Sequence, residues 1–226
     1  MFSFFELLFL NLKVKVKNCW EYFKVIYYYY SNGSFFLADT YLLVLYLFQS
    51  PFKISRDFLA SQGESDLYTF GETPLTTLDT ITKRVGLQQS DLVFELGCGR
   101  GRTCFWIHAF IGCRVVGVDN VPAFIHKANA VKERYSIPGV EFRLEDILKT
   151  DLAGATVIYL YGICYSSEFI RTLIYRLEAL PKGAKVITVS YALEEFLKPI
   201  PFKIVDIFPA DFTWGSGDIY LQVKEE

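Results

Sequence analysis

The sequence predicts an α/β protein: a doubly wound, mostly parallel sheet of seven strands that ends in an antiparallel hairpin, with a helical cap at the N-terminus. From residue 91 onward, short apolar runs alternate with stretches of helical apolar spacing, which is the pattern of βα units in a parallel sheet covered on both faces. The first run, Leu92–Phe94, leads through Glu95 into glycines at alternate positions, Gly97, Gly99 and Gly101. An apolar run that breaks into glycines predicts a buried strand, a tight turn and then a helix.

Residues 1–60 differ in composition from the rest of the chain, since much of its 17% aromatic content lies there. Met1–Leu12 is apolar but contains Glu6, and it lacks the basic start and small-residue cleavage site of a signal peptide. The apolar run Phe35–Phe48 is shorter than the ~18–20 residues that a membrane-spanning helix needs. We therefore expect residues 1–68 to form a helical cap, and peripheral membrane contact through residues 1–60 is compatible with it.

A polar segment, Gln62–Thr73, follows as a linker or lid, and the domain that carries the chemistry is expected over residues 69–226. Leu75–Val85 has the apolar spacing of a helix, with Pro74 at its start and Gly86 at its end. Beyond the first βα unit, the expected strands and helices are Arg114–Asp119, Pro122–Tyr135, Val140–Leu144, Val157–Leu160, Glu168–Leu180, Lys185–Ser190, Phe202–Phe208 and Ile219–Val223, with a loop over residues 209–217.

The charge and the cysteine content exclude several classes of protein. The net charge is −2 at pH 7 and the isoelectric point is about 5.8, so the whole chain lacks the basic character typical of nucleic-acid binding. The five cysteines are odd in number and have no C-x-x-C spacing, which argues against a disulfide framework or a zinc site. A reducing compartment is expected, and therefore a cytoplasmic location.

The glycine turn has the features of a nucleotide-cofactor site, and two details select the cofactor. Its G-x-G-x-G spacing is one residue shorter than the dinucleotide fingerprint G-x-G-x-x-G. Glu95 places a negative charge at the tip of the strand, where it would repel a pyrophosphate and attract a cation. S-adenosylmethionine, which joins an adenosine to an ammonium and a sulfonium, fits such a turn. Asp119 ends the next strand about 20 residues later, the spacing at which an acid reaches a ribose diol.

In the order of these motifs, the chain from about Thr69 to its end resembles the class I (seven-strand) S-adenosylmethionine-dependent methyltransferases, which have a Rossmann-like fold. The resemblance implies that the glycine turn embraces the cofactor and that Asp119 binds its ribose. It also implies that Asp146 faces the adenine amino group, with Ile147 beside the ring. The cofactor-binding residues expected in this part of the chain are Glu95, Gly97, Gly99, Gly101, Asp119, Asn120, Glu145, Asp146 and Ile147.

A narrower resemblance rests on the segments F-G-E-T, V-I-Y-L-Y-G and G-A-K-V-I-T-V-S-Y and on a late T-W-G…Y. These segments look like those of the non-SET lysine methyltransferases, whose best-known members are the disruptor-of-telomeric-silencing family. The resemblance implies that Glu72 and Thr73 approach the methionine end of the cofactor. It further implies that Trp214 and Tyr220 line a channel that admits the acceptor lysine.

The departures from that family bear on the substrate. Phe70 stands where those enzymes have Tyr, Tyr161-Gly162 replaces their Asn pair, and the chain has no long basic tail for nucleosomes. A lysine of a protein other than nucleosomal histone is therefore the expected acceptor. Tyr161, at the tip of the fourth strand, is expected nearest the transferred methyl group and in contact with the cofactor. The catalytic candidates are Tyr161, Trp214 and Tyr220, and no metal is required.

Other functions stay open at this point. A methyltransferase for a small apolar or lipid-soluble acceptor would suit the apolar N-terminus. A nicotinamide-dependent oxidoreductase is a more distant alternative, disfavoured by Glu95 and by the glycine spacing. An inactive module that keeps the cofactor site is another. Arg100 and Arg102, within and after the glycine turn, are predicted to be solvated or interface residues.

Overall fold

The computed structural model describes residues 4–63, 66 and 70–225. Within these ranges the helices are α1 (Phe4–Tyr29), α2 (Gly33–Leu45), α3 (Pro51–Ser61), α4 (Leu75–Val85), α5 (Arg102–Ile111), α6 (Pro122–Arg134) and α7 (Ser167–Leu177), with a 3₁₀ turn η1 (Leu193–Glu195). The strands are β1 (Leu92–Leu96), β2 (Arg114–Asp119), β3 (Val140–Leu144), β4 (Val157–Leu160), β5 (Lys185–Val189), β6 (Phe202–Asp211) and β7 (Ser216–Lys224). The expected boundary at residues 68 and 69 and part of the expected linker lie outside the described residues.

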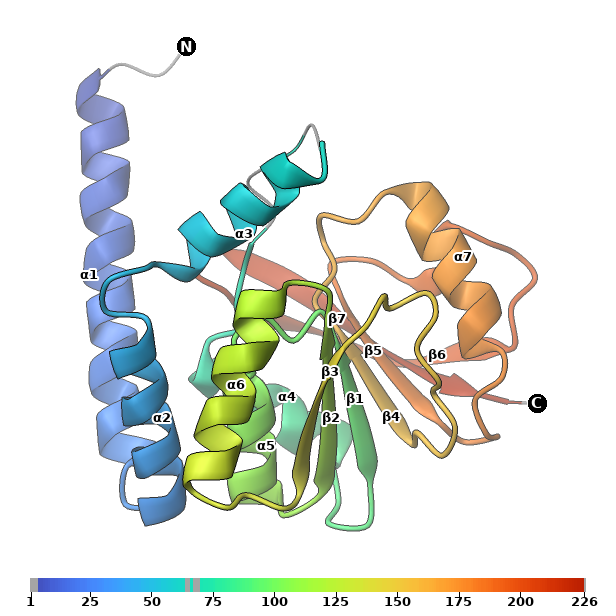
Figure 1. The fold of residues 1–226 in the computed structure, drawn as a ribbon. Helices are drawn as coiled ribbons and strands as arrows, with labels where there is room; N and C mark the ends of the chain where they lie inside the picture. Colours follow the sequence, from blue (N-terminus) through green and yellow to red (C-terminus); the bar gives the residue numbers. More distant parts are fainter. Residues whose placement is uncertain (1–3, 64–65, 67–69, 226) are drawn as a thin grey trace.

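The described strands form one seven-stranded sheet in the order β3-β2-β1-β4-β5-β7-β6 (Figure 1). Neighbouring strands from β3 to β5 are parallel, whereas β7 runs antiparallel to both β5 and β6. Parallel neighbours require crossover connections, most of which contain a helix here. The prediction of a Rossmann-like, mostly parallel sheet with an antiparallel C-terminal hairpin is confirmed.

The C-terminal hairpin is longer than the sequence predicts. The expected loop over residues 209–217 is largely taken up by β6 and β7, which leave Phe212–Gly215 as the turn between them. Phe208 and Ala210 are both buried, and this period of two continues the strand past the point where a loop was expected. The hairpin turn is therefore short and begins with a buried aromatic residue.

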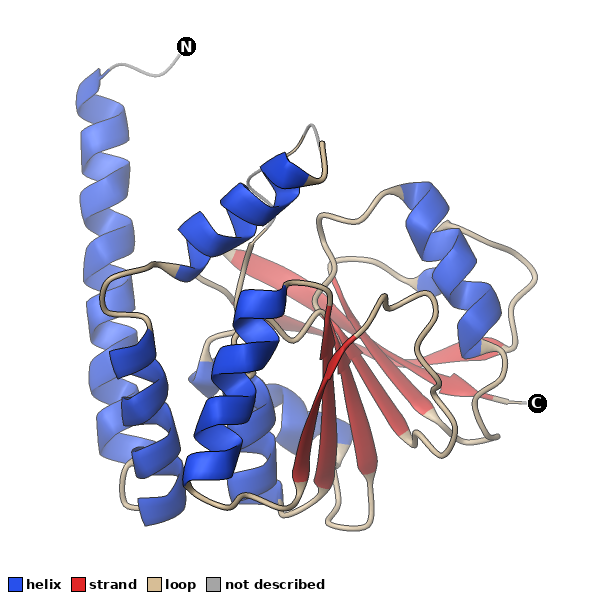
Figure 2. Ribbon diagram, viewed as in Figure 1, coloured by secondary structure: helices blue, strands red, loops and turns tan. Residues whose placement is uncertain are grey.

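Helices cover both faces of the sheet (Figure 2). Helices α4, α5 and α6 lie on one face and α7 lies on the other. The alternation of side chains along β1 shows the division, because Val93 packs into the first core and Phe94 into the second. Glu95 follows two residues after Val93 and therefore points to the face that α5 covers.

The N-terminal helices share the hydrophobic core of the first face. Tyr29 of α1 and Phe35 and Leu42 of α2 are buried in it. The ring of Tyr29 packs edge-on against Trp106 of α5, with the ring centroids 5.4 Å apart. This packing places α1 and α2 over the helix that follows the glycine turn, so their side chains can reach the turn itself.

Candidate active site

The glycine turn after β1 is held by hydrogen bonds of its own backbone. Gly97, Gly99 and Gly101 have φ angles of 82°, 52° and 72°, which residues with a side chain rarely adopt. The amides of Gly97 and Cys98 donate to one carbonyl of β2, at 2.8 and 3.0 Å. The amide of Gly99 donates to the carboxylate that ends β2 (2.8 Å), and that of Gly101 to the carbonyl of Cys98 (2.9 Å). Since these four amides are bonded within the chain, none of them is free to bind a pyrophosphate.

Glu95 keeps its carboxylate inside the protein and lines a pocket. The hydroxyl of Thr103 lies 2.6 Å from both carboxylate oxygens, and the thiol of Cys104 donates to one of them at 3.0 Å. The pKa of Glu95 is raised to about 7, chiefly by burial and further by the carboxylates of Glu72 and Asp119, against the lowering effect of the two hydrogen bonds. Thr103 and Cys104 were not identified from the sequence, although both lie in the first turn of the helix that the glycines begin.

The pocket lies at the carboxyl ends of β1 and β4, where open α/β sheets bind their ligands. Its walls are the segment Gly71–Thr73, Glu95, the glycine-turn residues Gly97 and Cys98, Arg102 and Thr103 of α5, and Tyr161. Two of these residues, Glu72 and Glu95, contribute carboxylates to one small space. The hydroxyl of Thr73 is hydrogen-bonded to that of Tyr159, which attaches the segment to β4. Glu72 is paired with Arg100 and Arg102 with Asp39, so Glu95 is the acidic group of the pocket without a cationic partner. These charges suit the positively charged amino-acid end of S-adenosylmethionine better than a phosphate group.

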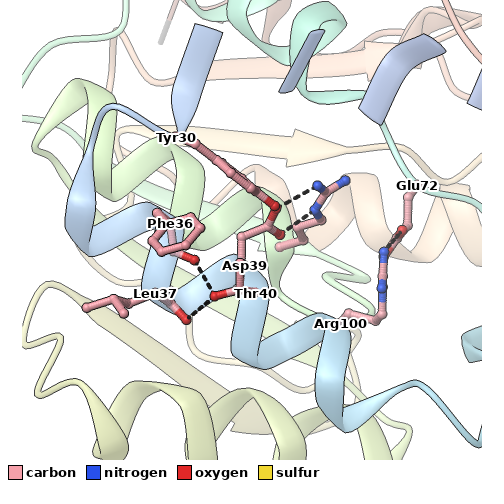
Figure 3. Close-up of polar contacts among 8 residues, drawn as sticks. Tyr30, Phe36, Leu37, Asp39, Thr40, Glu72 and Arg100 are labelled. Carbon is pink, nitrogen blue, oxygen red and sulfur yellow. Dashed lines mark hydrogen bonds and ion pairs between the residues drawn. The ribbon is translucent and has the colours of Figure 1, made fainter. Parts of the chain in front are cut away.

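Two arginines next to the pocket are held in ion pairs (Figure 3). Arg100 donates through Nε and Nη2 to the two oxygens of Glu72, at 2.6 and 2.5 Å. Arg102 donates in the same way to Asp39 of α2, at 2.6 and 2.8 Å, and the hydroxyl of Tyr30 adds a hydrogen bond at 2.9 Å. Both guanidinium groups are largely buried, because α2 and the segment at Glu72 cover the turn. Of the two positions predicted for them, solvated or at an interface, the solvated one is wrong. Arg100 thereby holds Glu72 at the wall of the pocket.

The residues expected around a nucleoside lie at the neighbouring strand ends. Asp119 is buried at the end of β2, and its two oxygens accept hydrogen bonds from the amides of Gly99 (2.8 Å) and Val121 (2.9 Å). These backbone hydrogen bonds do not use every lone pair of the carboxylate, so it has capacity for a ribose hydroxyl. The side chain of Ile147 approaches the turn, since its Cδ1 is 3.9 Å from the place that a β-carbon on Gly97 would occupy.

The remaining members of the expected cofactor set are less enclosed. Asn120 and Glu145 are exposed. Asp146 accepts a hydrogen bond from a backbone amide two residues later, at 2.9 Å, and so shapes the turn after β3. The roles of these three residues toward an adenosine stay predictions.

Tyr165, which the sequence did not single out, places its hydroxyl 2.8 Å from the β-carbon position of Gly97, so the loop after β4 also covers the turn.

Three aromatic side chains, Tyr161, Phe212 and Trp214, gather beside the pocket and are called the aromatic group below. The indole nitrogen Nε1 of Trp214 donates to the hydroxyl of Tyr161 at 2.7 Å. The ring of Phe212 stacks on that of Trp214 at 5.3 Å between centroids and lies 5.4 Å from that of Tyr161. Trp214 is 50% exposed, whereas Tyr161 forms part of the pocket wall. The aromatic group therefore connects the protein surface with the pocket.

Tyr220 does not join the aromatic group. Along β7, Ile219 and Leu221 pack into the core on the side of α4, so the alternation of the strand directs Tyr220 to the opposite face of the sheet. Burial raises the pKa of Tyr220, and the next contribution comes from Glu195 of η1, which lies on that opposite side. The expectation that Tyr220 lines the same channel as Trp214 is not met, because the sequence motif does not show which face of the strand a residue occupies.

The affinity for S-adenosylhomocysteine should fall as the pH is lowered through 7. At pH 6 Glu95 is largely protonated in the free protein, whereas a bound ammonium group favours the carboxylate, so binding must release a proton. The dissociation constant, measured by titration calorimetry, is expected to be about five- to tenfold larger at pH 6.0 than at pH 7.5. The variant Glu95→Gln is the matched control, since it should bind more weakly but without this pH dependence. An equal dependence in Glu95→Gln would assign the titration to another group.

The chain shares its central part with known methyltransferases. Residues 93–191 match the family model described as a methyltransferase domain. Over 81 residues the chain is 33% identical to the sterol 24-C-methyltransferase of Saccharomyces cerevisiae. The matched segment makes up 35% of this chain and 21% of the yeast protein. Over 218 residues it is 22% identical to a histone-lysine N-methyltransferase of Dictyostelium discoideum that is specific for lysine-79 of histone H3. This match makes up 82% of this chain and 12% of the Dictyostelium protein. The chain thus spans about a fifth and about an eighth of the lengths of these two relatives.

Solved structures share the fold. An RNA methyltransferase from Salinibacter ruber, in complex with S-adenosyl-L-homocysteine, matches 69% of this chain and 95% of its own, with a TM-score of 0.54 and 26% identity. The magnesium protoporphyrin IX methyltransferase of Synechocystis, with bound S-adenosylmethionine, matches 78% of this chain and 98% of its own, with a TM-score of 0.57 and 17% identity. The cofactor in these structures is the one that the charges of the pocket suit.

Proposed function

We propose that this protein, whose chain carries a class I S-adenosylmethionine-dependent methyltransferase domain, methylates the side-chain amine of a lysine in another protein. The proposal is carried by the aromatic group, which leads from the exposed ring of Trp214 to Tyr161 in the pocket wall. Aromatic rings beside the pocket suit the aliphatic stem of lysine and exclude water from its amine. When bound, S-adenosylmethionine supplies an electrophilic methyl group.

The methyl group can be accepted only by a neutral amine. A lysine with a pKa of about 10.4 requires roughly 4–5 kcal/mol to lose its proton at pH 7. Desolvation beside the aromatic rings lowers the pKa of the amine and so reduces this requirement. Burial raises the pKa of Tyr161, so its hydroxyl stays protonated at neutral pH and does not act as the base. Trp214 donates to one lone pair of the Tyr161 oxygen, and the second lone pair can accept an N–H of the amine. The amine proton passes to solvent, and the nitrogen lone pair stays free to take the methyl group.

A second candidate is a small, lipid-soluble acceptor. The sterol 24-C-methyltransferases of three fungi, 28–33% identical over 81 to 124 residues, support it by the acceptor in their name. Lysine is favoured because the aromatic group ends at a hydroxyl in the pocket wall, and because the match to the Dictyostelium histone-lysine enzyme extends over 218 residues. Both candidates use the same cofactor pocket and differ only in what enters beside Trp214.

The acceptor class can be tested by methyl transfer into a lysate. The purified protein is incubated with methyl-labelled S-adenosylmethionine and host lysate, and the product is separated into protein, lipid and RNA fractions. We expect the label in protein, and recovery of methyl-lysine after hydrolysis. Label confined to the lipid fraction would support the second candidate, and label confined to RNA would contradict both.

Removing the outer ring of the aromatic group should impair transfer without impairing cofactor binding. In Trp214→Ala the acceptor loses an aromatic wall and Tyr161 loses its hydrogen bond, so turnover on protein should fall at least about tenfold. The affinity for S-adenosylhomocysteine should stay within about twofold, because Trp214 is not part of the pocket wall. Tyr175→Ala, which removes a similarly exposed ring from α7, is the control and should leave turnover unchanged. A parallel loss of turnover and affinity in Trp214→Ala would show that Trp214 is structural.

A further inference from the structure

Over residues 16–29, whose side chains the structure describes, helix α1 has two apolar sides, and only one of them is packed. Val25 and Tyr29 are buried against the rest of the protein. The opposite side carries four apolar residues that are each between 61% and 81% exposed, and these four are called the outer stripe: Val16, Trp20, Phe23 and Tyr27. The described structure thus leaves a row of large apolar side chains in water.

The outer stripe is one continuous face of the helix. Its residues are separated by four, three and four positions, the spacing that aligns side chains on one side of an α-helix. With a rise of 1.5 Å per residue, the stripe is about 17 Å long. Val25 lies two positions after Phe23 and therefore on the far side, which agrees with its burial.

Exposed apolar side chains are concentrated in this part of the protein. Among the described residues, twelve of the eighteen large apolar side chains that are exposed lie between Val16 and Phe52. They include Phe48, which follows α2 and is fully exposed. In Figure 1, α1 and α2 lie side by side at one edge of the molecule, away from the sheet. A soluble monomer rarely exposes so many large apolar groups in one region, so this region is expected to contact something apolar.

We propose that the outer stripe of α1 binds the surface of a lipid bilayer. Trp20 and Tyr27 have the apolar ring with a polar edge that is enriched where a membrane meets water. The helix contains four lysines and two glutamates, so it carries a net positive charge suited to anionic lipids. Neither glutamate lies in the outer stripe. In the described part of the chain, no helix has both the length and the apolar character to cross a bilayer. The helix would therefore lie along the interface, and the proposal does not depend on the acceptor of the methyl group.

A second copy of the chain fits the stripe less well than a bilayer. Helix pairs in water pack mainly aliphatic residues at the seam, whereas three of the four stripe residues are aromatic. Burial of Trp20 and Tyr27 in a protein seam would also require hydrogen-bond partners for their polar atoms. At a membrane surface, water and lipid headgroups supply those partners.

The test is sedimentation of the full chain with vesicles of phosphatidylethanolamine and phosphatidylglycerol. The unaltered protein should sediment with the vesicles, and the double variant Trp20→Ser/Phe23→Ser should have a partition coefficient lower by at least about tenfold. Tyr175→Ser is the matched control, because Tyr175 is 60% exposed on α7, and it should partition like the unaltered protein. Circular dichroism checks that the variants are folded, and Tyr27→Ser is a second, single-site variant of the stripe.

Three results would overturn the proposal. The first is that the unaltered protein does not sediment with vesicles, and the second is that the stripe variants sediment as well as it does. The third is that sedimentation velocity without lipid shows a dimer that Trp20→Ser/Phe23→Ser dissociates, which would assign the stripe to a second copy. Methyl transfer to a soluble acceptor should be unchanged in the stripe variants, so failure of this proposal is distinguishable from failure of the proposed function.

Discussion

Asp39→Ala is expected to destabilise the protein by about 3–5 kcal/mol, because it leaves a buried guanidinium without its partner. Asp39 is fully buried and accepts two hydrogen bonds from Arg102 and one from Tyr30. Its removal leaves the charge of Arg102 and the hydroxyl of Tyr30 without their partner in a largely buried site. The free energy of unfolding from denaturant titration measures the effect, which is a large part of the ~5–15 kcal/mol typical of a folded domain.

Two further variants make the origin of that loss measurable. Asp206→Ala removes the partner of Arg84 in an ion pair at the surface, where water replaces the lost contact, so its effect should be far smaller. Asp39→Ala combined with Arg102→Met removes both buried charges and should recover much of the stability. If Asp39→Ala is no more destabilising than Asp206→Ala, the pair does not hold α2 to the glycine turn.

Gly101→Ala is expected to damage both folding and cofactor binding. A β-carbon at this position would lie 2.3 Å from Cε1 of Phe142, and the φ angle of 72° is itself unfavourable for alanine. Phe142 cannot move away easily, since it is buried and its ring packs 5.1 Å from that of Phe105. We expect a loss of about 2–4 kcal/mol in the free energy of unfolding. We also expect at least about tenfold weaker binding of S-adenosylhomocysteine, because the turn and the start of α5 must shift.

Gly86→Ala separates the two causes of this effect. Gly86 has a φ angle of 63°, but its β-carbon position has no heavy atom within 4 Å. This variant should therefore lose only the roughly 1 kcal/mol that a left-handed conformation costs alanine, with unchanged ligand affinity. Equal losses in Gly86→Ala and Gly101→Ala would show that the contact with Phe142 is unimportant.

The sequence by itself determined the central sheet and the glycine turn, because their signals are local. The helix Leu75–Val85 and the strands Arg114–Asp119, Val140–Leu144 and Val157–Leu160 have the predicted bounds. Each is a short apolar run or helical repeat that a glycine, a proline or a charged residue ends. Glu95 and Asp119 could be found in the same way, since each lies at the end of such a run and parallel strands bring those ends together.

Only the tertiary structure decided which side chains meet across the fold. Asp39 and Arg102 are 63 positions apart, and nothing in the spacing near either residue indicates a buried pair. The direction of Tyr220 depends on the register of β7, and the contact of Phe212 with Trp214 depends on where the hairpin turns. A local pattern specifies the conformation of the backbone, whereas the partner of a side chain is set by what packs over it, and that is a property of the whole fold.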